Sequence, residues 1–380
     1  MVLGALLLAA GCRHASPPFY PLGIYSVRST NDFAAISAAG FTVVSGPAEP
    51  GYLGAARTAG LRVLASFGTR AGGKFDEAKA REAVARFDRH PALWAWYLAD
   101  EPDLNGVSPP QVERAHRALK RAGAGKPTAL VLSKGYEALH YAPIADITMI
   151  DYYPISWLPL AAFPKQVRQA RLALGRSRPM VAVIQAFDWS RYPAFHFPEK
   201  DLRAPTPEEL RCMAYAALVC RATGLFFYPF NDGCWDMRRE PRMWEALCGL
   251  VTEIRERQPL FQSRQLWWPY TVRFGDPLRR FNAALEAAIQ PAFLRVRRGS
   301  QCVPAGDYLL AVNTTDQAHS YRISLPYPRE SLVPVLGEDR ACPVASHWLT
   351  DEFAPWAVHV YGPLTGRDKP LGPAPIELDE

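Results

Sequence analysis

The stretch Leu93-Trp-Ala-Trp-Tyr-Leu-Ala-Asp-Glu-Pro-Asp103 decides the fold of this chain. Its first seven residues are apolar without alternation, which is typical of a strand buried on both faces of a parallel sheet. Three carboxylates follow at Asp100, Glu101 and Asp103, and Pro102 ends the strand because proline cannot donate to a ladder. Acids at the carboxyl end of a strand lie at the rim of the sheet, where α/β folds bind ligands. We therefore expect the functional centre here.

The same unit, a short apolar run followed by an amphipathic segment, recurs on both sides of this stretch. Eight strands are expected, at residues 22–27, 41–45, 61–67, 93–99, 128–132, 145–150, 180–184 and 224–228. Helices are expected between them, with Ser108-Pro-Pro110 and Thr206-Pro-Glu-Glu209 as clear starting signals. Eight strand–helix units in about 240 residues favour a (β/α)₈ TIM barrel. A doubly wound open sheet is the alternative, but no Gly-rich phosphate loop follows the first strand.

The pattern changes beyond Trp267 and Trp268. Short strand-like runs at 293–296, 308–312, 321–325 and 356–361 are separated by turn signals. This pattern of short runs and turns predicts a small all-β sandwich. The chain then divides into a leader at 1–12, a barrel at 20–262, a β-sandwich at 268–362 and a flexible tail at 363–380.

The N-terminus has the character of an export signal. Residues 2–10 form an apolar run too short to span a bilayer, and Leu8-Ala-Ala-Gly-Cys12 resembles a bacterial lipobox. That resemblance implies lipid attachment at Cys12, a membrane anchor and a place in the bacterial cell envelope. In an oxidising compartment Cys302 and Cys342 could pair.

Composition excludes several classes of function. The net charge of +6 is spread without a basic block, so nucleic acid is not an expected partner. With 49% hydrophobic residues the chain can build a large core. No zinc spacing, Gly-x-Ser-x-Gly elbow, P-loop or dinucleotide fingerprint is present in the sequence, so neither a metal nor a cofactor is predicted.

The ends of the later strands supply a polar, acidic and aromatic set. Beside the three acids of the first stretch, it consists of Asp151, Tyr152, Tyr153, Gln185, Asp188, Trp189, Tyr228, Asn231, Asp232 and Trp235. Cleavage of a glycosidic bond needs one acid to protonate the leaving oxygen and a second carboxylate to attack carbon or activate water. Flat aromatic rings stack on the apolar faces of sugars. The set therefore favours action on an oligosaccharide or polysaccharide.

Two motifs carry a family resemblance. Tyr97-Leu-Ala-Asp-Glu-Pro102 and Asp151-Tyr-Tyr-Pro154 resemble the TIM-barrel glycoside hydrolases of the large retaining clan, which includes β-galactosidase-like and cellulase-like enzymes. The resemblance covers residues 20–262 and implies that Glu101 is the general acid/base. The clan has Asn where this chain has Asp100, and its nucleophile is a Glu at the end of strand seven, where this chain has Gln185.

This departure leaves three interpretations. Asp188, Asp151 or Asp232 replaces the missing nucleophile; or the barrel only binds glycan; or Gln185 merely forms hydrogen bonds and the strand register is shifted. Our catalytic candidates are Glu101, Asp188 and Asp151, with the remaining members of the set as substrate contacts. Simpler roles compete with each: Glu101 as a structural acid paired with an arginine, Asp151 and Asp188 as loop residues, Asp232 as a turn residue, and the rings as packing. A scaffold that docks a partner near Trp267 and Trp268 is a further alternative.

Overall fold

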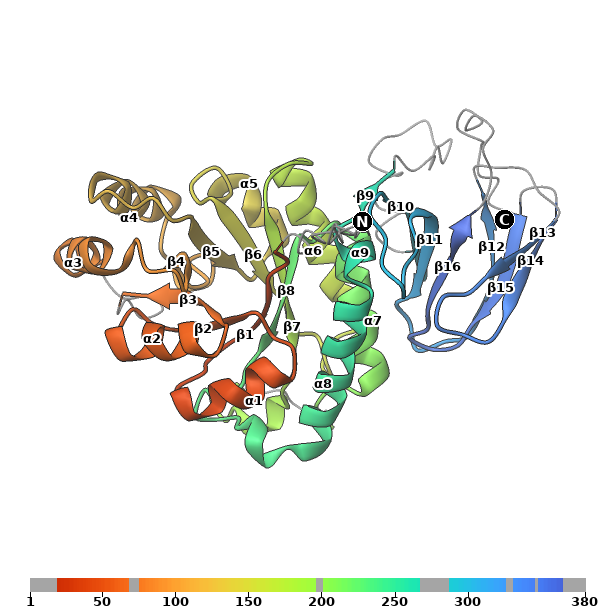
Figure 1. Cartoon of the computed structure of the whole chain (residues 1–380), viewed down its shortest axis with the longest axis horizontal. Helices are drawn as coiled ribbons and strands as arrows, with labels where there is room; N and C mark the ends of the chain where they lie inside the picture. Colours follow the sequence, from red (N-terminus) through yellow and green to blue (C-terminus); the bar gives the residue numbers. More distant parts are fainter. Residues whose placement is uncertain are drawn as a thin grey trace, which may run out of the picture.

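A computed structural model describes residues 19–67, 75–195, 201–266, 287–325, 331–345 and 348–364. Eight parallel strands close into a barrel in sequence order, and β1 pairs with β8 to complete it (Figure 1). The predicted TIM barrel is confirmed. The strands are β1 (Leu22–Ile24), β2 (Val43–Pro47), β3 (Arg62–Ser66), β4 (Leu93–Ala99), β5 (Thr128–Leu132), β6 (Ile147–Asp151), β7 (Met180–Gln185) and β8 (Gly224–Tyr228).

Helices surround the barrel. They are α1 (Phe33–Ala38), α2 (Pro50–Thr58), α3 (Glu77–Phe87), α4 (Pro109–Arg121), α5 (Ala138–Tyr141), α6 (Ala162–Leu174), α7 (Pro207–Val219), α8 (Pro241–Glu256) and α9 (Gln258–Phe261). Short 3₁₀ turns are η1 (Thr30–Asp32), η2 (Gly135–Glu137), η3 (Trp189–Arg191) and η4 (Met237–Arg239). Both predicted helix starts are capping boxes, Ser108 with Gln111 and Thr206 with Glu209, each followed by a proline in the first turn.

Side chains fill the inside of the barrel. Val43, Leu64 and Val183 are fully buried there, together with the ring of Phe226. Gly23 on β1 faces that ring: a Cβ on Gly23 would lie 2.4 Å from the ring of Phe226. Glycine is therefore required at this position, because a close-packed core cannot absorb an overlap of that size.

A second body of strands follows the barrel. One antiparallel sheet has the order β16-β11-β10-β9 and the other β12-β15-β14-β13, which confirms the predicted β-sandwich (Figure 1). The strands are β9 (Arg264–Gln265), β10 (Ile289–Val296), β11 (Gly306–Asn313), β12 (His319–Ser324), β13 (Ser331–Pro334), β14 (Ala341–Ala345), β15 (Trp348–Phe353) and β16 (Val358–Leu364). These strands begin before residue 268 and reach into the predicted tail; the rest of that tail, 365–380, and Trp267 and Trp268 lie outside the described residues.

Helix α7 joins the two bodies. Residues Cys212 to Val219 are all buried, because this helix covers β7 on one side and the sheet of β10, β11 and β16 on the other. Arg211 Nη1 donates to the carbonyl of Val358 at 3.2 Å, and the Cys212 thiol donates to Asn313 O at 3.3 Å. The sandwich therefore shares a core with the barrel.

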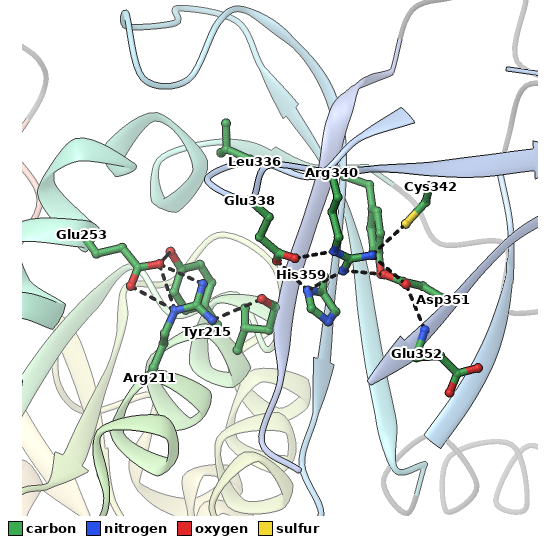
Figure 2. Close-up of polar contacts among 12 residues, drawn as sticks. Arg211, Tyr215, Glu253, Leu336, Glu338, Arg340, Cys342, Asp351, Glu352 and His359 are labelled. Atoms are coloured by element: carbon green, nitrogen blue, oxygen red, sulfur yellow. Dashed lines mark hydrogen bonds and ion pairs between the residues drawn. The ribbon is translucent and has the colours of Figure 1, made fainter. Parts of the chain in front are cut away.

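Polar clusters flank this junction (Figure 2). On the barrel side, Glu253 accepts from Arg211 at 3.0 Å and from the Tyr215 hydroxyl at 2.8 Å. On the sandwich side, Arg340 lies between Glu338 and Asp351, with N–O distances of 2.6 and 2.8 Å. These ion pairs satisfy charges that would otherwise be costly at a partly buried surface.

Cys302 and Cys342, which could pair in an oxidising compartment, are both free thiols in this structure. Cys302 is exposed before β11, whereas Cys342 is buried on β14 in the other sheet, where Arg340 Nη1 donates to its sulfur at 3.1 Å. Within the described ranges, no helix combines the length and apolar character that crossing a membrane requires.

Candidate active site

A cavity of about 910 Å³ opens where the carboxyl ends of the barrel strands meet. We call it the main cavity. Of the predicted site residues, those that line it are Asp100, Glu101, Asp151, Tyr152, Tyr153, Trp189 and Tyr228. Residues from the ends of β1, β4, β5, β6, β7 and β8 contribute to its wall, as the barrel architecture predicts.

The backbone at Glu101 is unusual. Its φ of 40° lies in the left-handed region, which non-glycine residues rarely adopt. The loop holds this conformation through hydrogen bonds: the backbone N–H groups of Leu104 and Asn105 donate to Glu101 O, at 3.0 and 2.9 Å. The Asn105 side-chain amide also donates to Asp100 O and Glu101 O, both at 3.1 Å. Such backbone conformations cost about 1–3 kcal/mol and occur preferentially at functional sites.

The carboxyl of Glu101 is poised near neutrality. Burial raises its pKa to about 7, with further increases from the charges of Asp100 and Asp103 and an opposing effect from a hydrogen bond with Asp151. Along the described parts of the chain, no arginine forms an ion pair with Glu101. The competing role as an arginine-paired structural acid is therefore not what the structure shows.

Asp151 is the partner of Glu101. It is 7% exposed at the end of β6, and burial, followed by the charges of Glu101 and Asp100, raises its pKa well above the ordinary value. The Tyr153 hydroxyl donates to Asp151 Oδ2 at 3.4 Å. Two buried carboxyls in contact cannot both ionise readily, so the charge of an ionised Glu101 opposes the ionisation of Asp151.

The other two acids of the first stretch have different partners. The Tyr97 hydroxyl donates to Asp100 Oδ1, and burial raises the pKa of Asp100. Asp103 accepts from the backbone N–H groups of Ser133 and Lys134, at 3.3 and 2.8 Å. Asp100 therefore faces the cavity, whereas Asp103 ties the loop after β4 to the loop after β5.

Tyrosine rings cluster beside the acids. Tyr153 and Tyr228 stack with ring centroids 5.5 Å apart, and Tyr25 lies 6.2 Å from Tyr97 and 6.0 Å from Tyr228. All four line the main cavity, and burial raises the pKa of each hydroxyl. The hydroxyls therefore stay protonated, able to donate hydrogen bonds beside flat apolar faces.

Gln185 ends β7 as expected but does not line the main cavity. Its side chain is fully buried; its Oε1 accepts from Ile155 N at 2.8 Å, and its Nε2 donates to Ile155 O and to Phe187 O. The expected strand register is correct, so a register shift does not explain this residue. Gln185 satisfies the backbone that follows β6, so its buried side chain is not presented to a ligand in the main cavity.

Asp188 and Asp232 also serve their own loops. The Asp188 carboxylate caps η3 by accepting from Ser190 N at 2.7 Å. The Asp232 carboxylate accepts from the hydroxyls of Tyr192 and Tyr228, at 2.7 and 2.9 Å. Neither aspartate lines the main cavity, so neither stands where a missing nucleophile would be needed.

Asn231 and Trp235 lie in the same turn as Asp232. Asn231 Oδ1 accepts from Gly233 N at 3.2 Å, and the backbone N–H of Trp235 donates to Asp232 Oδ1 at 2.9 Å. Trp235 is 3% exposed and belongs to the core. Neither residue lines the main cavity, and the ordinary interpretation as turn and packing residues is correct here.

Several lining residues escaped the sequence analysis. They are Tyr25, Arg28, Tyr97, Lys134 and Tyr192. Arg28 follows β1 and Lys134 follows β5, so the rule that strand ends line the site would have found both, had it been applied to every strand. Nowhere in the described ranges do three or more His, Cys, Asp or Glu side chains gather so as to hold a metal ion.

The fold is similar to those of several solved glycosidase structures. A glycoside hydrolase family 5 protein from Bacteroides vulgatus ATCC 8482 superposes with a TM-score of 0.58 at 11% identity, covering 90% of this chain and 89% of that one. An α-amylase from Geobacillus thermoleovorans, solved with acarbose, gives 0.52 at 11% identity over 87% and 90%. A β-galactosidase from Bacillus circulans sp. alkalophilus gives 0.50 at 12% identity over 62% and 56%.

These similarities define the class of the fold. The chain has a glycosidase-like (β/α)₈ barrel with a small all-β domain. No protein-family model matches the sequence, and no curated protein matches it either. At such low identity the similarity establishes the architecture alone.

Proposed function

We propose that the protein is a glycoside hydrolase that acts on an oligosaccharide or polysaccharide, with Glu101 as the proton donor. One observation carries the proposal: Glu101 lines the main cavity with a pKa of about 7 and is hydrogen-bonded to a second carboxyl. A general acid works best when its pKa lies near the operating pH. Glycosidases raise the pKa of one carboxyl by burial and by a neighbouring charge for this purpose.

Asp151 is the proposed second carboxylate. Retaining glycosidases place their carboxyls about 5–5.5 Å apart and inverting ones about 6.5–9.5 Å apart. The contact between Glu101 and Asp151 is closer than either separation. A sugar that enters must therefore separate the pair. In the proposed reaction Glu101 gives its proton to the glycosidic oxygen. Asp151, whose pKa is raised by burial and by the charge of Glu101, has to ionise once the pair is separated in order to face the developing positive charge.

The remainder of the cavity suits a carbohydrate. Rings of Tyr153, Trp157 and Trp189 line it and can stack on sugar faces, while the tyrosine hydroxyls can donate to sugar oxygens. A volume of about 910 Å³ exceeds what a single sugar ring fills. Among proteins with similar folds, one was solved with acarbose and another with maltotriose. An oligomeric glycan is accordingly the proposed ligand.

Glycan binding without turnover is the second candidate. It is favoured by Gln185, a buried neutral amide that occupies the position where the resembled clan has its nucleophile. An amide cannot stabilise a developing cation as a carboxylate does. The two candidates differ in one outcome: only the first releases sugar.

The test is hydrolysis of a panel of plant and microbial glycans by the full chain and by Glu101→Gln. We expect the wild-type protein to release sugar, and Glu101→Gln to bind the same glycan without releasing it. Glu82→Gln, an exposed change on α3, is the matched control and should keep full activity. Binding without hydrolysis by the wild type would favour the second candidate. Near-normal turnover by Glu101→Gln would refute the role of Glu101.

We also propose that the protein is exported and lipid-anchored in the bacterial envelope through Cys12. The support is the lipobox-like Leu8-Ala-Ala-Gly-Cys12, which lies outside the described residues. Export in a bacterial host should place the protein in the membrane fraction, from which detergent releases it. Cys12→Ser should abolish that anchoring; an unchanged membrane fraction for this variant would contradict the proposal.

A further inference from the structure

A second pocket lies at the opposite end of the barrel from the main cavity. Its volume is about 340 Å³, and we call it the arginine pocket. Tyr20 precedes β1 and Thr223 precedes β8, so the pocket sits where the strands begin. Leu294 of β10 forms part of its wall, which places the pocket at the junction with the β-sandwich.

Three arginines line this pocket: Arg176 and Arg264, which are exposed, and Arg221, which is half-buried. Burial and the positive charges of Arg176 and Arg264 lower the pKa of Arg221, so both of these arginines lie close enough to Arg221 to act on it. In the part of the chain that the structure describes, no carboxylate forms an ion pair with any of them. Three neighbouring cations without an acid form a positive surface that attracts anions.

Capping of helix ends does not account for these arginines. Arg176 and Arg221 follow α6 and α7, where cations commonly bind the last carbonyls. Here the buried Arg171 donates to the carbonyls of Gly175 and Arg221, at 2.8 and 2.9 Å. Gln265 donates to Val219 O at 3.1 Å. These two side chains therefore take up carbonyls at both helix ends.

The lining also holds unsatisfied hydroxyls. Tyr20 is 6% exposed and its hydroxyl has no hydrogen-bond partner; the buried Oγ of Ser263 has none either. Buried hydroxyls usually have a hydrogen-bond partner. Both oxygens are closed to solvent, so they lie beneath the surface of the arginine pocket, and it is the three arginines lining the pocket that point to a ligand.

We propose that the arginine pocket binds a phosphate-bearing ligand through Arg176, Arg221 and Arg264. One guanidinium group can donate two parallel hydrogen bonds to two oxygens of a phosphate. Three such groups also offset the negative charge of a phosphate ester. The ester can come from a soluble metabolite or from a phospholipid headgroup. This site is independent of the glycosidase proposal, since it shares no residue with the main cavity.

The sequence supplies a reason to test the lipid source. Phe19 lines the arginine pocket, and Cys12, the proposed lipid attachment point, precedes it by seven positions. Seven residues span at most about 25 Å when extended. An anchor at Cys12 would therefore hold this end of the barrel near a bilayer and turn the main cavity away from it.

The experiment measures binding by the full chain at low ionic strength. The probes are sn-glycerol 3-phosphate, by calorimetry, and vesicles of phosphatidylglycerol and phosphatidylcholine, by co-sedimentation, against vesicles of phosphatidylcholine alone. In the double variant Arg176→Gln/Arg264→Gln we expect affinity to fall by about tenfold or more, because charged hydrogen bonds are lost. Arg81→Gln/Arg114→Gln, two exposed changes on α3 and α4, removes the same charge elsewhere.

The two probes distinguish a soluble phosphate ester from a phospholipid headgroup as the ligand. Binding of the soluble ester that only the pocket variant loses supports the proposal with a soluble ligand. If the protein binds only the anionic vesicles, and only the pocket variant loses this binding, the result supports the proposal with a lipid headgroup as the ligand. An equal loss in both double variants would show attraction by net charge and overturn the proposal, as would wild-type protein that binds neither probe.

Discussion

The raised pKa of Glu101 suits this carboxyl to proton donation but lowers the stability of the folded chain. Its pKa of about 7 in the folded chain is higher than its ordinary value of 4.5, because burial and neighbouring acids disfavour the charged form. The unfolded chain ionises this carboxyl more easily, so the folded state loses stability as pH rises from about 4.5 through 7. A strained backbone at the same residue adds to this cost.

We expect Glu101→Gln to raise the melting temperature at pH 8 and to leave it nearly unchanged at pH 4, where the carboxyl is protonated in both states. A gain of about 1 kcal/mol corresponds to about 2–4 °C in a domain of this size. Calorimetric melting at the two pH values measures the difference. Equal melting temperatures of variant and wild type at pH 8 would contradict the raised pKa.

Asp100 supplies part of that shift, so its charge should be visible in the pH dependence of hydrolysis. Removing it in Asp100→Asn leaves Glu101 easier to ionise, and activity should be lost at a lower pH than in the wild type. The pH profile of kcat/KM shows this directly. Asp236→Asn, in a turn away from the main cavity, is the control and should leave the profile in place.

At the scale of elements, the loop after β6 depends on the end of β7. Gln185 satisfies both backbone groups of Ile155, and Gln185→Leu would leave them buried without partners. Each orphaned group costs about 1–3 kcal/mol, so we expect a loss of that order in the free energy of unfolding, measured by urea denaturation. Gln185→Glu should not increase kcat, because this side chain is held away from the main cavity. An increase would restore the nucleophile hypothesis.

Most barrel elements could be predicted because their signals are local. β4, β5 and β8 are continuous apolar runs, and α4 begins at a proline with a capping serine. Strands β13 to β15 were missed because they are short and only half apolar, as the alternating burial of β14 shows.

The site was only partly predictable for a different reason. Glu101 and Asp151 could be predicted to lie together because each follows a parallel strand, and the carboxyl ends of these strands meet at one rim of the barrel. Whether a polar side chain at that rim faces the cavity or its own loop depends on the turn that follows. Gln185 and Asp188 face their loops, and no local pattern in the sequence distinguishes them from cavity residues.

At the scale of the whole molecule, the barrel and sandwich form one core through α7. The residues Cys212 to Val219 are buried partly by the sheet of β10, β11 and β16. We expect a chain truncated after residue 262 to expose this apolar face and aggregate, whereas the full chain stays monodisperse in gel filtration. A soluble, folded truncation would show that the sandwich is dispensable for the barrel.

The most direct test of the central claim is the pH dependence of glycan hydrolysis by the wild-type chain and by Glu101→Gln. If Glu101 donates the proton, wild-type kcat/KM falls as pH rises through about 7, and the variant shows no measurable turnover at any pH. Hydrolysis by Glu101→Gln with the same pH profile as the wild type would contradict the role of Glu101 as proton donor.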